Sequence, residues 1–335
     1  MRNRLFAVWG AVVCCVYISY SQNDTLPYER YDQHYIVYTD VGFSTAPMKI
    51  KYPFANGIDK IKFVSNSKMV WGIGFAHKWF NLRLGLNLPL TLRSQKKFGP
   101  TTNYDLGFDF SLKQFFFDVD LHYYQGYNLK NAYTWNDTLD QKYEPNLYIP
   151  DLKAASFSIN AWQFWNPHFK MQAFRGKSAS YTKDIQTFYL KYNMSVYGVS
   201  NDKGLIPTEL IDSSNTKTGA TSMTSFDMGI IPGYSYVKRL HHFQIGIMTG
   251  LGLVIQNKSY FTAGTNRNFL GLGFRYDVRF VAGYNRPHFF MMFVSDFDNK
   301  SFRFNEVKFF QTYYNLKLAA GYRFDNKKDR KKKKK

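Results

Sequence analysis

Charged side chains occupy the polar face of several alternating segments in this 335-residue chain. Acidic residues and one histidine of this kind come from two consecutive segments: Asp105, Asp109, Asp118, Asp120 and His122. Basic residues and one further aspartate do the same elsewhere: Arg83, Arg275, Asp277, Arg279, Lys317 and Arg323. Since residues two positions apart share one face of a β-strand, we predict that these side chains face a common interior.

Acids from two neighbouring segments and bases from others have two interpretations. In the first, the charges neutralise one another, because charges in a narrow interior must be paired. In the second, an acidic side and a basic side of a pore orient a charged solute. The narrow interior of a barrel with about twelve strands favours the first interpretation.

The same residues offer two chemical alternatives. Asp118, Asp120 and His122 place two carboxylates and an imidazole on one strand face, which suits a divalent cation. Ser111, His122 and Asp109 supply the groups of a lipase-like triad. The sequence has no Gly-x-Ser-x-Gly elbow to activate the serine. We therefore expect no catalytic residue, metal site or cofactor, with a barrel enzyme acting on lipid as the alternative.

The elements that carry these side chains are predicted as β-strands. In the last one, Leu316, Leu318 and Tyr322 share an apolar face opposite Lys317 and Arg323. The same alternation predicts thirteen strands, at residues 35–43, 68–78, 80–90, 102–113, 115–127, 154–165, 169–175, 188–198, 226–236, 242–254, 269–282, 288–297 and 307–324.

Thirteen strands cannot return the chain to the side from which it started. One prediction is therefore wrong, either near residues 35–51 or around the turn Asn166-Pro167, and we expect twelve strands with fourteen as the alternative. Residues 46–67, 128–150 and 200–222 are predicted as outer loops, and the shorter connections as periplasmic turns.

Strand length separates a membrane barrel from a soluble sandwich, which would show the same alternation. Many predicted strands run about 10–13 residues, enough to cross a bilayer at a tilt, whereas soluble strands average about 5–6. Aromatic residues, with 26 Tyr and 32 Phe, gather at strand ends as in interface girdles. We predict an all-β fold, an antiparallel transmembrane β-barrel.

The N-terminus predicts export. Arg2 and Arg4 precede an uncharged apolar stretch, and Ser19-Tyr20-Ser21 ends it with small residues suited to cleavage. Cys14 and Cys15 lie inside this segment, so the predicted mature chain has no disulfide or thiolate chemistry. We expect a signal peptide at 1–21, a periplasmic, unpaired lead-in at 22–34, a barrel at 35–324 and a basic tail at 325–335.

The formal net charge of +20 is concentrated in part in that tail. A solvated tail touching anionic lipid headgroups is the expected role for an exported chain, and nucleic acid is not an expected partner.

Two resemblances support an outer-membrane location. Gly321-Tyr322-Arg323-Phe324 resembles the C-terminal β-signal that the barrel assembly machinery recognises, although residues 325–335 follow it. The layout, with the Asn166-Pro167 hairpin and the segment Pro232-Gly233-Tyr234-Ser235-Tyr236, resembles a family of outer-membrane barrels from the Bacteroidota, the domain of unknown function 4421. This resemblance implies a barrel and brings no activity.

Three functions agree with the sequence. The first is an outer-membrane barrel acting as a narrow channel for small solutes. The second is a closed barrel that serves as a structural or partner-binding component of an outer-membrane assembly, with the loops at 128–150 and 200–222 as contacts. The third is the lipid-modifying enzyme.

Overall fold

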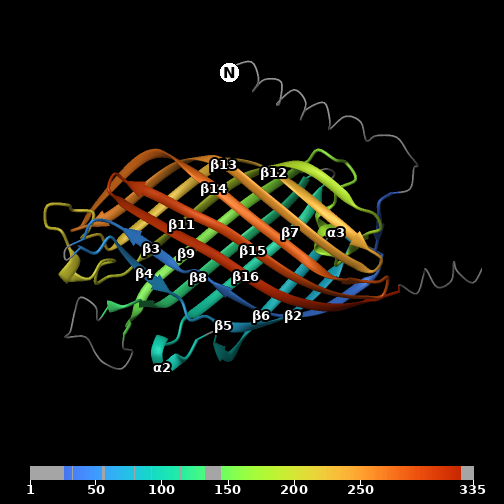
Figure 1. The fold of residues 1–335 in the computed structure, drawn as a ribbon, viewed down its shortest axis with the longest axis horizontal. Helices are drawn as coiled ribbons and strands as arrows, with labels where there is room; N and C mark the ends of the chain where they lie inside the picture. Colours follow the sequence, from blue (N-terminus) through green and yellow to red (C-terminus); the bar gives the residue numbers. More distant parts are fainter. Residues whose placement is uncertain are drawn as a thin grey trace, which may run out of the picture.

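Twelve long strands form a closed antiparallel barrel (Figure 1). The computed structural model describes residues 26–31, 33–54, 57–78, 80–91, 93–112, 115–132 and 145–325. The ring consists of β2 (Tyr35–Thr45), β5 (Lys68–His77), β6 (Phe80–Thr91), β7 (Thr102–Leu112), β8 (Phe115–Leu129), β9 (Leu147–Phe164), β11 (Ile185–Ser200), β12 (Ser222–Leu240), β13 (Phe243–Thr262), β14 (Thr265–Asn285), β15 (Phe289–Phe304) and β16 (Val307–Phe324). Strands that follow one another in the ring order pair, and β16 pairs with β2 to close it.

The predicted transmembrane barrel and its twelve strands are confirmed. Burial alternates residue by residue along β13 as far as Asn257, and the outward side chains of this stretch are mostly apolar. Leu251, Leu270 and Phe274 are 62%, 78% and 68% exposed, which only a lipid environment makes favourable on this scale. The predicted signal peptide at 1–21 and the tail from residue 326 onward lie outside the described residues.

One of the thirteen predicted strands, at residues 169–175, is wrong. These residues belong to a plug, at 169–181, whose short helix α3 (Met171–Arg175) lies inside the barrel at the end with the short turns (Figure 1). Met171, Ala173 and Phe174 are all buried, because the segment is surrounded by the barrel wall and has no lipid-facing side. A single buried helical turn is too short for its periodicity to be distinguished from that of a strand.

The lead-in is also paired, contrary to prediction. In it, β1 (Tyr28–Arg30) forms an antiparallel ladder with β10 (Ala179–Tyr181), which follows α3. This small sheet and α3 together close the short-turn end. A buried cluster that includes Trp162, Phe169 and Phe290 packs around them.

The barrel narrows from twelve strands to ten at its other end. There β3 (Met48–Lys51) pairs with β16, and β4 (Lys60–Val64) pairs with both β3 and β8. Strands β6 and β7 end before they reach this rim, so β4 pairs directly with β8. Residues 46–67, predicted as a loop with ragged strand ends, thus contain a hairpin that completes the outer rim.

Long connections gather at this same end, which we call the loop end. The described part of the β6–β7 connection contains α2 (Gln95–Phe98), and the β11–β12 connection contains a 3-10 turn, η4 (Thr208–Leu210). The strands themselves extend further than predicted, so residues 128–129 and 147–150 belong to β8 and β9. Not every connection there is long, because β13–β14 and β15–β16 are joined by two-residue turns.

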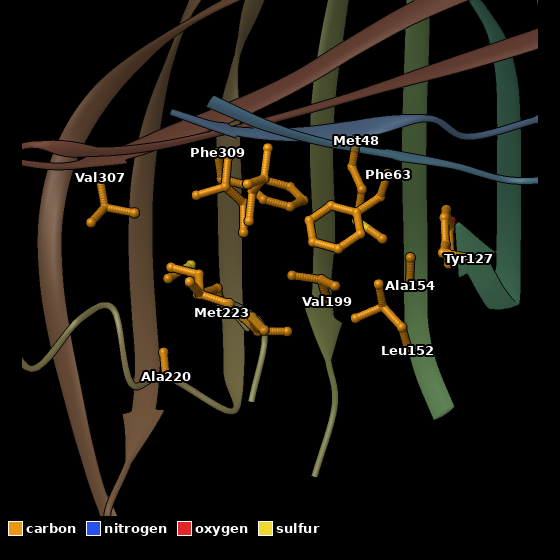
Figure 2. Packing of buried hydrophobic residues seen from close by; sticks show 14 of the residues in the cluster. Met48, Phe63, Tyr127, Leu152, Ala154, Val199, Ala220, Met223, Val307 and Phe309 are labelled. Atoms are coloured by element: carbon orange, nitrogen blue, oxygen red, sulfur yellow. The ribbon is translucent and has the colours of Figure 1, made fainter. Parts of the chain in front are cut away.

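A second buried apolar cluster fills the interior of the loop end (Figure 2). Its side chains come from the β3–β4 hairpin, from strands β8, β9, β11, β12, β13, β15 and β16, and from the β11–β12 connection; among them are Met48, Phe63, Tyr127, Leu152, Val199, Ala220, Met223, Val307 and Phe309. The interior is therefore apolar at both ends.

One line of the wall is only loosely paired. Among the described residues, β6 and β7 share a single ladder position, Asn81 with Asp109. Nearer the loop end, the Asn87 side chain donates a hydrogen bond of 3.1 Å to the Asn103 carbonyl. We call this line the β6–β7 seam.

Among the helices that the described ranges contain, none is long and apolar enough to cross a membrane.

Candidate functional site

Between the two apolar clusters, the interior is a network of paired charges. Its most buried pair joins Arg275 of β14 to Asp227 of β12, with 2.8 Å between Nη2 and Oδ2. The two side chains are 2% and 0% exposed. Gln256 and Ser225 also donate to the Asp227 carboxylate, and Arg275 donates to the Asn299 carbonyl at 2.7 Å. Both charges thus have the partners that burial requires.

A second group surrounds the buried indole of Trp162. Lys191 Nζ lies 3.5 Å from an oxygen of Asp277 and 4.7 Å from the centre of the Trp162 ring. Arg279 lies over the same ring, 5.5 Å from its centre, and its Nε donates to Asp296. Two cations on one indole, each with its own carboxylate, hold strands β9, β11, β14 and β15 together.

The plug contributes a charge to this network. Arg175, at the end of α3, pairs with Asp109 of β7 at 2.5 Å and lies 4.0 Å from Asp118 of β8. Asp118 also accepts a hydrogen bond from the Trp162 indole at 3.1 Å and lies 3.9 Å from Arg279. The plug is therefore attached to the wall by ion pairs as well as by apolar packing.

Two further pairs line the wall on the side of β2 and β6–β8. Arg83 binds Asp40 through two parallel hydrogen bonds, of 2.6 Å from Nε and 2.5 Å from Nη2. His122 Nδ1 lies 2.7 Å from Asp105, which also accepts a hydrogen bond of 3.2 Å from the Tyr124 hydroxyl. Such bidentate and charge-assisted contacts fix the register of the strands that carry them.

The side chains at all eleven positions named from the sequence are buried or half-buried. Asp105, Asp109 and Asp118 of the neighbouring strands β7 and β8 each contact a basic side chain, from His122, Arg175 or Arg279, which supports the first interpretation. Lys317 lies among the charges of Arg83, Asp40, Asp105 and Asp296. Asp120 lies opposite Gly107, beside the β6–β7 seam.

The sequence profile of the family described as "Domain of unknown function (DUF4421)" matches residues 22–324, which is nearly all of the described chain. The chain belongs to the DUF4421 family. This confirms the resemblance inferred from the sequence.

Curated proteins and solved structures add little to that assignment. No curated protein matches the sequence. Outer membrane protease OmpT from Escherichia coli aligns with a TM-score of 0.40 and 10% identity, over 90% of this chain and 99% of its own. A deltaS2 mutant of the TodX monoaromatic hydrocarbon channel aligns with a TM-score of 0.33 and 8% identity, over 87% of this chain and 91% of its own. Ail, the attachment invasion locus protein of Yersinia pestis, aligns with a TM-score of 0.21 and 12% identity, over 64% of this chain and 100% of its own. At these values the likenesses carry no argument about activity.

Arg323 departs from the role of the other interior charges of this DUF4421 barrel. Its fully buried guanidinium donates to main-chain carbonyls of Gly176 and Lys177 in the plug, at 2.8 and 2.7 Å. It also donates to the carbonyl of Arg286 in the β14–β15 turn and to the side chain of Asn285, the last residue of β14. We predicted a charge paired within the lumen, and its acceptors are instead carbonyl groups that join the plug to the closing strand.

Several network residues were missed from the sequence. They are Asp40, Lys191, Asp227, Asp296, Asp298, Lys300 and Arg175. The first six lie at alternate strand positions, as the eleven predicted residues do. Applying this two-residue alternation to every strand would have found them. Arg175 had no such signal, because its segment is not a strand.

The two chemical alternatives are not assembled. His122 is bonded to Asp105, while Asp118 contacts Trp162 and two arginines, so these side chains do not converge on a cation. Ser111 lies six residues along β7 from Asp105, which pairs with His122, a separation of roughly 20 Å. The proposed triad of Ser111, His122 and Asp109 therefore has no geometry for catalysis.

The outer face of the narrowed rim carries a concentrated positive charge. Lys49 lies directly opposite Lys62, and Lys51 lies opposite Lys60 and Lys308 on its two sides. We call these five residues the lysine ridge. Like charges directly opposite each other in a sheet destabilise it, so the fold alone does not account for this arrangement.

The β11–β12 connection is tied to the same rim. The Tyr52 hydroxyl donates to the Asp212 carboxylate, and Ser214 also donates to Asp212. The hydrogen bond from Ser214 and, to a smaller extent, the one from Tyr52 lower the pKa of Asp212. The carboxylate in turn raises the pKa of Tyr52. The loop is thereby fastened over the apolar cluster.

Proposed function

We propose that this DUF4421 barrel is an outer-membrane protein with a sealed lumen, which acts as a structural or partner-binding component and not as a channel. The observation that carries the proposal is the continuous filling of its interior. An apolar cluster with the plug closes one end, paired charges occupy the middle, and a second apolar cluster closes the other.

Packing around the plug supports a seal. The cavity beside it, lined by residues that include Asn81, Asp109 and Arg175, measures about 20 Å³. That space holds about one water molecule and cannot pass a hydrated solute. Gly246 supports the same conclusion, because a Cβ atom there would lie 2.8 Å from the ring of Phe174.

The loop end offers the surface for a partner. An open hollow of about 230 Å³ lies between the β11–β12 and β13–β14 connections, and the residues that line it include Asp212, Asn215, Thr216 and Arg267. The loop bearing Asp212 is anchored by buried Leu205 and Leu210, so it presents this surface in a fixed form. A preorganised polar surface suits recognition of another outer-membrane protein.

We expect the refolded protein to give no current steps in a planar lipid bilayer. Heat-modifiable migration on a gel would verify that the same sample is folded, and a known porin would verify that the bilayer detects pores. Replacing residues 169–181 by a short Gly-Ser linker removes the plug, and this variant should also give no current steps, because the loop-end cluster still closes the other end. Discrete steps from the unmodified protein would contradict the sealed lumen.

A second part of the proposal concerns lipid. The lysine ridge lies just beyond the apolar belt that ends at Tyr314 on β16, at the depth of lipid headgroups. Among the ion pairs of the described residues, the only one that involves the lysine ridge joins Lys60 to Asp59. Phosphorylated headgroups of the surrounding membrane would supply the missing negative charge.

Changing Lys49→Gln together with Lys62→Gln removes one opposed pair. In a neutral detergent we expect stability to stay the same or rise by up to about 1 kcal/mol, because repulsion is relieved. Added anionic phospholipid should raise the melting temperature of the unmodified protein more than that of this variant. Lys153→Gln with Lys203→Gln, two exposed lysines outside the ridge, is the matched control. Equal responses from all three proteins would refute the headgroup role.

A further inference from the structure

Two histidines and an aspartate converge at the short-turn end, outside the lumen. His34 Nε2 lies 3.0 Å from Asp325 Oδ1, and His288 Nδ1 lies 3.8 Å from the same oxygen. One ligand atom from each of the three residues lies within 4.8 Å of the others. No other group of this kind is found among the described residues.

The three residues come from separate parts of the chain. His34 immediately precedes β2, His288 belongs to the β14–β15 turn, and Asp325 immediately follows β16. Barrel closure is what brings them together, because β16 pairs with β2 on one side and with β15 on the other. Nothing in the local sequence pattern of any one of them indicates the cluster.

Neighbouring groups hold the rings in place. His288 stacks on Tyr322, with 6.2 Å between ring centres and 21° between planes. His34 meets the ring of Tyr31 edge-on at 5.9 Å, and its main-chain nitrogen donates to the Tyr31 carbonyl at 2.9 Å. His77 contacts the His34 carbonyl at 3.1 Å. The imidazoles are therefore oriented by the fold, independently of any bound ion.

The spacing matches a transition-metal site. Ligands about 2.1 Å from a tetrahedral zinc ion lie about 3.4 Å from one another, and the two measured distances fall on either side of that value. Two imidazoles and one carboxylate are a donor set suited to Zn²⁺ and related divalent ions, not to Ca²⁺ or Mg²⁺. The side chains of His34, Asp325 and His288 are 21%, 34% and 53% exposed, so water can reach a fourth position.

A simple ion pair explains less of this geometry. His34 with Asp325 would satisfy a pair, yet His288 also directs a ring nitrogen toward the same carboxylate oxygen. We propose that His34, His288 and Asp325 form a binding site for a divalent transition-metal ion of the zinc type, which joins the first, last and penultimate strands of the barrel. Such an ion would stabilise the closed ring by binding only to it.

The test uses the untagged full chain, refolded and freed of metal with a chelator. Zinc titration followed by desalting and metal analysis should give one equivalent bound, and zinc should raise the melting temperature. His288→Gln and Asp325→Asn, both at exposed positions, should each weaken binding at least tenfold and abolish the thermal shift. His168→Gln removes another exposed histidine, in the connection between β9 and β11, and should behave like the unmodified protein.

Co²⁺ provides a second measurement that does not depend on stability. Its visible absorption should appear with the unmodified protein and the His168→Gln control, and be lost in His288→Gln. Heat-modifiable migration would establish that each variant is folded. Zinc binding by His288→Gln or Asp325→Asn that equals that of the unmodified protein would overturn the proposal, and so would an unmodified protein that binds none.

Discussion

Arg323→Ala is expected to abolish the heat-stable barrel or to lower its free energy of unfolding by about 3–5 kcal/mol. The buried guanidinium satisfies carbonyl groups in two segments, the plug and the β14–β15 turn. It also packs against the rings of Tyr31 and Phe290, 4.0 and 4.8 Å from their centres. Alanine would leave those buried acceptors without donors, each at a cost of about 1–3 kcal/mol.

Arg286→Ala is the matched control for this change. Arg286 lies at the same end and is exposed, and its described side-chain contact is with the ring of Tyr284. Its loss should cost less than about 1 kcal/mol. Thermal melting followed by gel migration would compare the two variants. Equal melting temperatures for Arg323→Ala and the unmodified protein would show that the plug does not depend on this residue.

Asp227→Ala is expected to destabilise the barrel by about 3–5 kcal/mol, because it leaves the Arg275 charge buried and unpaired. The double change Asp227→Leu with Arg275→Met should recover most of that loss, since apolar side chains of similar volume can replace a buried ion pair. Denaturant unfolding of the single and double variants would measure both effects. A double variant as unstable as the single one would mean that the other hydrogen bonds of Asp227 dominate.

An exposed ion pair of nearly equal length provides the control. Lys238 and Asp184 lie 2.7 Å apart, against 2.8 Å for Arg275 and Asp227, but their side chains are 48% and 40% exposed. Asp184→Ala should therefore change stability by only about 0–1 kcal/mol. The contrast between the two pairs isolates burial as the cause.

The strands were predictable because alternation over ten or more residues is a strong local signal. The face that carries Arg275, Asp277 and Arg279 followed from the same signal. Pairing did not follow, because it depends on which distant strands become opposite each other in the closed ring. Arg275 finds Asp227 across 48 positions, and Tyr52 finds Asp212 across 160.

The plug was the clearest failure. Phe169, Met171 and Ala173 alternate like a strand, and the turn Asn166-Pro167 before them resembles a hairpin. Only the absence of a lipid-facing side distinguishes the segment, and that property belongs to its position inside the barrel. The same dependence on closure hid the cluster of His34, His288 and Asp325.

The β6–β7 seam has a consequence for how the wall responds to force. Other neighbours in the ring, such as β13 with β14 and β15 with β16, are joined by long continuous ladders, and parting them would break many hydrogen bonds together. Along the seam the described strands share one ladder position and two side-chain hydrogen bonds, so parting them costs little. Lateral tension in the surrounding bilayer would concentrate there, and opening this line would first break the contact of Asn81 with Asp109, the residue that also holds Arg175 of the plug.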